Sequence, residues 1–243
     1  MLLLVDIGNT YTKIKLENDS RIFRIETSKI KNISSLKKLF PSELSFDSVC
    51  ISSVSKGKEL VFKEYFDSKD ISSVIIDKDL KFNIKYPSLN ELGSDLMALM
   101  EGCSLIDGSF IAISLGTASV FLYVKDYEFM GCAIAPGLLS SLDGLINTAS
   151  MIEDTSLSGK YELLGMNTID SLRDGVLLGH SFMVDGYIKA IKDKYNNTEL
   201  KTYMIGGFSD VISKNINHEL IINQELIFNG MINIYKNNEG NIK

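Results

Sequence analysis

The chain has few of the residues that mark several common classes of protein. Its 243 residues contain only three cysteines and two histidines. The cysteines, Cys50, Cys103 and Cys132, are odd in number and far apart, which is typical of reduced thiols in a cytoplasmic protein. Neither His180 nor His218 has a metal-ligand spacing or a neighbouring cysteine pair. The sequence therefore indicates neither a disulfide scaffold nor a zinc site.

Long hydrophobic runs and basic clusters are also missing. The apolar stretch Met1–Val5 is too short for a signal peptide or a membrane span, and no later run is long enough. The net charge of −6 argues against binding to nucleic acid or to an anionic membrane, because both attract basic surfaces. We expect a cytoplasmic protein whose partners are small molecules.

Three familiar catalytic loops are absent from the sequence. It contains no GxxxxGK[ST] loop, no GxGxxG loop and no GxSxG elbow. Phosphate chemistry in this chain would therefore depend on carboxylates, hydroxyls, backbone amides and a bound Mg²⁺.

One pattern is present twice. It occurs as LLLVDIGNTYTKIKL in Leu2–Leu16 and as FIAISLGTASVFLYV in Phe110–Val124. The alignment pairs Asp6 with Ser114, Gly8 with Gly116, and Asn9-Thr10 with Thr117-Ala118. Each copy is an apolar strand, a glycine turn with a hydroxyl, and a second strand, and such turns can hold phosphate oxygens. The repeat predicts an α/β chain of two similar lobes facing a nucleotide cleft, as in a phosphotransferase.

The spacing of apolar residues extends this duplication. Three strands followed by alternating helices and strands are expected in each half, with long helices at Leu89–Leu105, Ile169–Tyr195 and Asn223–Asn237. No linker rich in Pro, Gly or Ser separates the halves. We expect lobes at residues 1–108 and 109–243, joined by a hinge, with the final helix able to pack back on the first lobe.

Six short motifs occur in an order that resembles one known family. They are DIGNT at Asp6–Thr10, GSD at Gly93–Asp95, LGTA at Leu115–Ala118, GCAIAPGL at Gly131–Leu138, GMNT at Gly165–Thr168 and IGG at Ile205–Gly207. Together they resemble the type III pantothenate kinases over nearly the whole chain. The resemblance implies a duplicated ribonuclease-H-like, actin-like fold and a homodimer. It also implies that ATP with Mg²⁺ phosphorylates pantothenate to 4'-phosphopantothenate, the first step of coenzyme A biosynthesis.

The resemblance assigns roles to individual residues. Asp95 corresponds to the catalytic base, and Asp6 is expected to hold Mg²⁺ through water. The ATP- and phosphate-binding residues it implies are Asp6, Ile7, Gly8, Asn9, Thr10, Tyr11, Thr12, Lys13 and Thr117. The substrate-binding residues it implies are Tyr86, Gly93, Ser94, Asp95, Leu96 and Thr168.

Local patterns leave simpler interpretations open for four of these residues. Asp95 could cap the helix that follows it, and Thr168 could cap the helix that begins at Ile169. Asp6 could be an ordinary turn aspartate, and Thr117 an ordinary turn threonine.

Two positions depart from the family pattern. Leu96 stands where the family has an arginine that holds pantothenate, and Ser114 stands where it has an aspartate that binds K⁺ or NH₄⁺. A hydroxyl is a weaker ligand for a hard cation than a carboxylate. Three hypotheses follow: a pantothenate kinase, a kinase for another small alcohol, or a silent relative that acts as a nucleotide-binding accessory protein. The presence of both Asp6 and Asp95 favours a working kinase.

Overall fold

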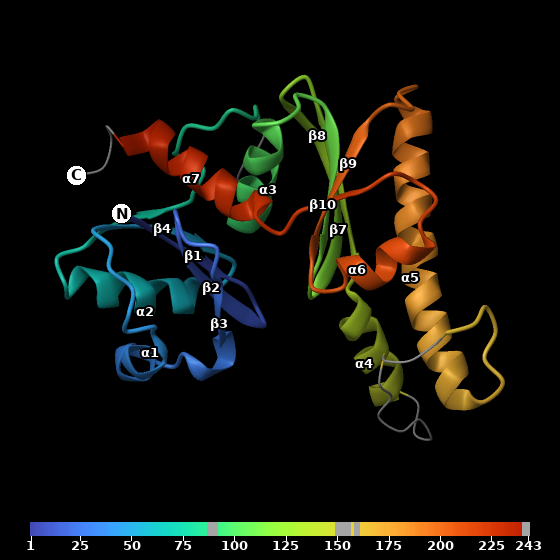
Figure 1. Ribbon diagram of the computed structural model, residues 1–243, viewed down its shortest axis with the longest axis horizontal. Helices are drawn as coiled ribbons and strands as arrows, with labels where there is room; N and C mark the ends of the chain where they lie inside the picture. Colours follow the sequence, from blue (N-terminus) through green and yellow to red (C-terminus); the bar gives the residue numbers. More distant parts are fainter. Residues whose placement is uncertain (87–91, 149–156, 158–160, 240–243) are drawn as a thin grey trace. The chain divides into compact units, whose positions relative to one another are not determined.

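The computed structural model describes residues 1–86, 92–148, 157 and 161–239 (Figure 1). The chain divides into two compact units, and each is described by itself. The first unit comprises Met1–Gly108 together with Glu225–Lys243, and the second comprises Ser109–Gln224. Across the described ranges, no helix is both long and apolar enough to cross a membrane.

A five-stranded sheet forms the centre of the first unit. Its strands lie in the order β3-β2-β1-β4-β5. The first three strands pair antiparallel, and β4 and β5 add in parallel beside β1. Their bounds are β1 Leu2–Ile7, β2 Tyr11–Leu16, β3 Phe23–Glu26, β4 Ser48–Ser53 and β5 Ser72–Ile75.

Helices cover both faces of this sheet. Figure 1 shows α1 (Ile33–Leu39) and α2 (Lys56–Asp67) on one face, with α3 (Ser94–Ser104) and α7 (Leu226–Asn238) on the other. Successive side chains of a strand point to opposite faces. The odd positions of β1, from Leu3 to Ile7, join the apolar cluster that includes Phe62 and Phe66 of α2. Asp6, at an even position, therefore faces the side of α3 and α7.

Two glycines let α3 and α7 approach closely. A Cβ atom on Gly102 would lie 1.8 Å from the carbonyl oxygen of Leu226, and one on Gly230 would lie 1.8 Å from that of Ala98. Any side chain at these positions would force the helices apart. The close contact joins the C-terminal helix to the helix that begins beside Asp95.

The second unit repeats the topology of the first. Its sheet has the order β10-β9-β6-β7-β8, with β6, β7 and β8 antiparallel and β9 and β10 added in parallel beside β6. In chain order this is the arrangement of the first sheet, so the sequence repeat corresponds to a structural one. The bounds are β6 Phe110–Leu115, β7 Ala118–Lys125, β8 Glu128–Pro136, β9 Lys201–Gly206 and β10 Ile221–Ile222.

One face of the second sheet packs against α4 (Leu138–Thr148), α5 (Thr168–Lys194) and α6 (Ser209–Ile212). The apolar cluster there includes Ile113 and Phe121 from the sheet, and Leu142 and Val184 from the helices. Two short 3₁₀ helices complete the described elements: η1 at Thr27–Lys29 and η2 at Ser213–Asn215.

Two of the expected helices begin later than the sequence pattern indicates. The helix expected at Leu89–Leu105 begins at Ser94 after a Gly93 cap, and residues 87–91 lie outside the described residues. The helix expected at Asn223–Asn237 begins at Leu226. Ile221 and Ile222 form β10 instead, and the Gln224 side chain accepts a hydrogen bond from the Gly206 N–H. The chain therefore stays in contact with the second sheet up to residue 224.

Candidate active site

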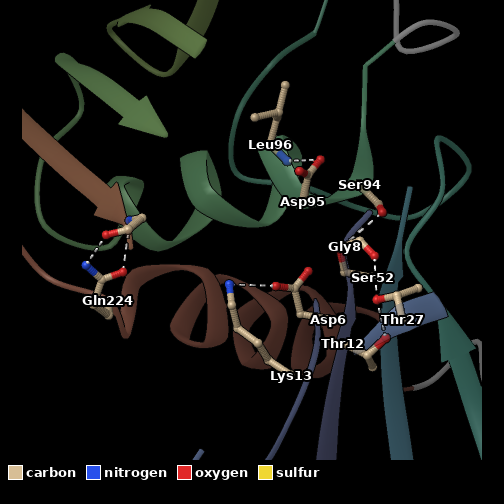
Figure 2. A network of polar contacts seen from close by, with 11 residues as sticks. Asp6, Gly8, Thr12, Lys13, Thr27, Ser52, Ser94, Asp95, Leu96 and Gln224 are labelled. Carbon is tan, nitrogen blue, oxygen red and sulfur yellow. Dashed lines mark hydrogen bonds and ion pairs between the residues drawn. The ribbon is translucent and has the colours of Figure 1, made fainter. Parts of the chain in front are cut away.

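Hydrogen bonds fix the turn between β1 and β2 (Figure 2). The Gly8 N–H donates to the Tyr11 carbonyl at 3.1 Å. The buried Thr27 hydroxyl donates to the Gly8 carbonyl at 2.8 Å, and the Thr27 N–H donates to the Thr10 carbonyl at 2.9 Å. Thr27 therefore binds two carbonyls of the turn on its inner side, while Asn9, Thr10 and Tyr11 are exposed.

Two residues predicted to bind ATP direct their side chains into the unit instead. Ile7 is fully buried in the apolar cluster with α2. Thr12 is also fully buried, and its hydroxyl lies 3.0 Å from that of Thr27. These residues can support a ligand on the turn only through the backbone.

Asp6 and Lys13 form an ion pair across β1 and β2. The two residues are direct partners in the antiparallel register, and Lys13 Nζ lies 3.2 Å from Asp6 Oδ2. Burial raises the pKa of the Asp6 carboxyl, and the charge and hydrogen bond of Lys13 oppose that rise. A second positive charge at this place would favour the ionised form further.

Asp95 lies in the first turn of α3. The Leu96 N–H donates to its Oδ1 at 2.9 Å. Burial, together with repulsion from the nearby Asp6, raises the pKa of Asp95 to about 6. Hydrogen bonds from backbone N–H groups and the charge of Lys13 limit that rise. The structure therefore brings both predicted carboxylates, and the lysine, within electrostatic reach of one another.

Ser94 anchors the start of α3 to the end of β4. Its hydroxyl accepts a hydrogen bond from the Ser53 N–H at 2.7 Å, donates to the Ser53 carbonyl at 3.0 Å, and lies 3.1 Å from the Ser52 hydroxyl. Only 5% of Ser94 is exposed. The neighbouring Leu96 is apolar and also buried. Neither residue therefore exposes a polar side chain. The β4 anchor fixes the position from which Asp95 projects.

Tyr86 lies in an irregular segment that follows β5 in the chain. Its ring packs edge-on against Phe82, with the ring centres 5.4 Å apart. Burial raises the pKa of the Tyr86 phenol, and the charge of Glu101 adds to that effect.

The equivalent turn of the second unit carries different chemistry. Ser114 lies in β6 opposite Val120 of β7, where the first unit has Asp6 opposite Lys13. The Gly116 N–H donates to the Ala118 carbonyl at 3.0 Å, as Gly8 does to Tyr11. This turn is thus one residue shorter, so pairing Asn9-Thr10 with Thr117-Ala118 was wrong by one position at its end. Neither member of the ion pair exists in this copy.

The Thr117 turn is held close to the start of α4. The Thr117 carbonyl accepts hydrogen bonds from the Gly137 N–H at 3.0 Å and from the Ser140 hydroxyl at 2.7 Å. A Cβ atom on Gly137 would lie 2.2 Å from the Gly116 carbonyl oxygen. Gly137, the second glycine of the GCAIAPGL motif, is therefore required by this close approach.

Gly206 ends β9 beside this turn. Its φ is +119°, and a Cβ atom there would lie 2.1 Å from the Leu115 carbonyl oxygen. The side-chain amide of Gln224 accepts from the Gly206 N–H at 2.9 Å and donates to the Gly206 carbonyl at 3.0 Å. The IGG motif thus lies next to the second copy of the repeated turn.

Thr168 is the first residue of α5, and Asn167 is the residue that caps the helix. The Asn167 side chain accepts from the Asp170 N–H at 2.9 Å. A groove of about 560 Å³ is lined by Gly165, Met166, Asn167, Thr168, Ser171 and Leu172. Since Asn167 supplies the cap, Thr168 is not the capping residue.

The described part of the chain contains no cluster of three or more His, Cys, Asp or Glu side chains that could enclose a metal ion. The residues present fit a different kind of site. Mg²⁺ commonly keeps several waters and takes one or two carboxylates plus substrate phosphates. Asp6, a buried carboxylate in β1 next to the β1–β2 turn, is the residue that would hold such an ion.

Sequence reasoning did not single out Thr27, which holds the β1–β2 turn, or Glu101, a buried acidic residue of α3. Thr27 is 19 residues from Gly8, and no local pattern connects them. Glu101 is unusual in the sequence, because it is an acidic residue within the apolar run LMALMEGC. An acidic residue on the inner face of a helix requires hydrogen-bond donors from elsewhere in the chain.

Comparison with solved structures defines the class of this fold. The chain superimposes on a Baf family protein from Campylobacter jejuni with a TM-score of 0.63 and 20% identity, covering 98% of this chain and 99% of that one. It superimposes on MreB 5 of Spiroplasma citri, solved with AMPPNP, with a TM-score of 0.54 and 10% identity, covering 99% and 97%. The two five-stranded units are therefore those of the actin-like α/β fold.

The sequence defines the family within that class. A model of the type III pantothenate kinase family matches residues 2–190. A type III pantothenate kinase of Malacoplasma penetrans is 34% identical over 246 residues, covering 96% of each chain. Another from Pelagibacter ubique is 30% identical, covering 96% of this chain and 97% of that one. The chain belongs to the type III pantothenate kinase family.

Proposed function

We propose that this chain transfers the γ-phosphoryl group of ATP to the primary hydroxyl of pantothenate, giving 4'-phosphopantothenate and ADP. Membership of the family supports the reaction class. The observation that carries the proposal is the pair of carboxylates Asp6 and Asp95, one buried and one half-buried, with Lys13 beside them. A kinase needs this combination, because the attacking hydroxyl requires a proton acceptor and the phosphates require cations.

Asp95 acts as the general base in this proposal. The hydroxyl oxygen of the acceptor forms a bond to the γ-phosphorus, the bond from that phosphorus to the bridging β–γ oxygen breaks, and the hydroxyl proton passes to Asp95. A carboxyl with a pKa of about 6 is largely ionised at pH 7 and still holds a proton better than an ordinary aspartate.

The β1–β2 turn binds the phosphates. Asp6 would hold Mg²⁺ through water, and the ion would neutralise charge on the phosphate oxygens when bound. Lys13 adds a fixed positive charge, and Asn9, Thr10 and Tyr11 are exposed around the Gly8 turn. Thr117 of the second unit contacts ATP from the shorter turn in this proposal. Ser114 offers only a hydroxyl for a K⁺ or NH₄⁺ ion, which fits such an ion poorly.

Pantothenate contacts Tyr86, Gly93, Ser94, Asp95 and Thr168 in this proposal. Ser94 contributes through its backbone, because its hydroxyl is already bonded to β4. Leu96 cannot pair with the carboxylate of pantothenate as an arginine would. This single observation favours a second candidate acceptor, a small alcohol without a carboxylate.

Homodimer formation and a cytoplasmic location belong to the same proposal. Leu163, Leu164 and Met166 expose 71%, 79% and 96% of their surface, and contiguous exposed apolar residues are typical of an interface. All three cysteines are free, as expected of a reducing compartment.

An ADP-release assay tests the activity. The purified chain is given ATP, Mg²⁺ and either pantothenate or a panel of small alcohols, including the amide of pantothenate, which lacks its charge. We expect pantothenate-dependent ADP release and a new phosphorylated product by mass spectrometry. Release with the amide but not with pantothenate would favour the second acceptor class, and release with no acceptor would contradict both.

A further inference from the structure

Glu101 is a buried acidic residue that the proposed chemistry does not use. It lies in α3, six residues after Asp95, and its exposed fraction is 0%. A buried carboxylate is costly unless hydrogen-bond donors compensate its charge.

Three N–H groups supply that compensation. The Ile84 N–H donates to Glu101 Oε1 at 2.8 Å, and the Asn83 N–H donates to Oε2 at 3.1 Å. The side-chain amide of Asn233 in α7 also donates to Oε2, at 3.1 Å. Burial raises the pKa of Glu101, and these three hydrogen bonds oppose the rise. Both carboxylate oxygens therefore hold the backbone of one short segment.

The same segment is tied to α7 at its other end. The Asn238 side chain accepts from the Lys81 N–H at 2.9 Å and donates to the Lys81 carbonyl at 3.1 Å. The segment from Lys81 to Ile84 is thus fixed at both ends by side chains of α3 and α7. Tyr86 follows two residues after Ile84, and its ring packs on Phe82 of the same segment.

We propose that Glu101 is a positioning residue for the acceptor substrate: by binding the backbone of Asn83 and Ile84, it sets the place of Tyr86 relative to Asp95. Both acidic residues lie on one rigid helix, about 9 Å apart along its axis. The helix that carries the base therefore also fixes the segment that carries the tyrosine. This inference rests on the proposed function, because it takes Tyr86 as a contact of the acceptor.

Glu101→Gln tests the inference by steady-state kinetics. Glutamine keeps the shape of the side chain but turns an NH₂ group toward N–H donors, so at least one backbone bond is lost. We expect KM for pantothenate to rise by about tenfold or more, with KM for ATP within about twofold of the wild-type value. Glu64→Gln in α2 changes an exposed glutamate in the same way, and it should alter neither constant.

A double-mutant cycle separates positioning from general stability. In a Tyr86→Ala background, Glu101→Gln should raise KM for pantothenate little further, because the residue through which it acts is gone. Asn233→Ala, which removes one of the three donors, should raise it by about threefold. A lower melting temperature with an unchanged KM for pantothenate would overturn the proposal, as would a full effect of Glu101→Gln in the Tyr86→Ala background.

Hydrogen exchange provides a readout that does not depend on activity. The amides of Asn83 and Ile84 should exchange faster in Glu101→Gln than in the wild type, while amides of β1 keep their protection. If the wild type does not phosphorylate pantothenate, the proposed function fails. Unchanged protection at these two amides would instead overturn the role of Glu101, whatever the substrate.

Discussion

At the scale of single residues, the environment that would suit Asp95 as a general base also lowers the stability of the fold at neutral pH. Its pKa is about 6 in the folded chain, against an ordinary value of 3.8. The folded state therefore binds the proton more tightly than the unfolded state. The stability gained from the protonated form is complete below about pH 4 and is lost as the pH rises through about 6.

Asp95→Asn should consequently separate the two effects. Turnover should fall by about two to four orders of magnitude, because asparagine cannot accept the proton. The free energy of unfolding at pH 8 should rise by up to about 3 kcal/mol, because the ionised carboxylate is gone. Steady-state assays and urea unfolding at pH 8 measure the two quantities. For the wild type, turnover should also fall as the pH drops below about 6.

A purely structural role for Asp95 in the first turn of α3, which Gly93 caps, predicts the opposite outcome. Loss of an acidic residue from the first turn would then lower stability by about 0.3–1 kcal/mol and leave turnover intact. A variant that is less stable and fully active would show that Asp95 is not the base.

Because Ser114 is uncharged, we expect the activity not to depend on K⁺. Ser114 faces Val120 across the strands, so the place that holds Asp6 and Lys13 in the first unit is uncharged here. We expect activity to change by less than about twofold when K⁺ is replaced by Na⁺ at constant ionic strength, because a neutral hydroxyl binds a hard cation weakly. Ser114→Asp should introduce a dependence on K⁺. An unmodified enzyme that stops without K⁺ and recovers with it would refute this reading.

At the scale of elements, Thr27 fixes the turn between β1 and β2 that we propose to bind phosphate. It follows β3, and through its hydroxyl and its N–H it binds the carbonyls of Gly8 and Thr10. Both carbonyls are thereby bound on the inner side of the turn, where they cannot meet a phosphate. The turn that we propose to bind phosphate is thus positioned by a residue from outside the repeat.

Thr27→Val removes the hydroxyl and keeps the shape. KM for ATP should rise by about tenfold and stability should fall by about 1–3 kcal/mol, because the Gly8 carbonyl and the Thr12 hydroxyl lose a partner. Thr27→Ser should restore both values. Thr202→Val is a matched control, because the buried Thr202 hydroxyl has no hydrogen-bond partner in the described parts of the chain. Equal losses in both valine variants would rule out a specific role for Thr27.

Local patterns predicted the elements that contain long apolar runs. The apolar run before Asp6 and the glycine after it were sufficient for a buried strand and a turn. The two residues of β10 were not predictable, because two residues are too few to show the alternation of a strand. The role of Thr27 and the start of α7 were not predictable either, because both depend on tertiary hydrogen bonds.

At the scale of the whole molecule, the sequence repeat predicted the repeated topology of two sheets. It already paired Asp6 with Ser114, but the shorter second turn hid the equivalence of Lys13 and Val120 on the neighbouring strands. The lobes were expected at residues 1–108 and 109–243, with the final helix able to pack back on the first lobe, and residues from Glu225 onward do lie in the first unit. The close contact of α7 with α3 at Gly102 and Gly230 accounts for this packing.

We expect the chain to form a homodimer. Leu163, Leu164 and Met166 precede α5 and expose most of their surface, beside the groove that includes Thr168. An isolated chain would leave this apolar surface in water, and the homodimer that we propose would cover it. We expect a particle of twice 27.0 kDa by light scattering, and a monomer for the double variant Leu164→Asp, Met166→Asp.

Because Thr168 adjoins this surface, the monomer should show a KM for pantothenate raised by about tenfold and a nearly unchanged KM for ATP. Leu60→Asp in α2, at an apolar residue 50% exposed on the first unit, is the matched control and should remain a dimer. A wild type that is monomeric at micromolar concentration and fully active would show that one chain suffices for the reaction.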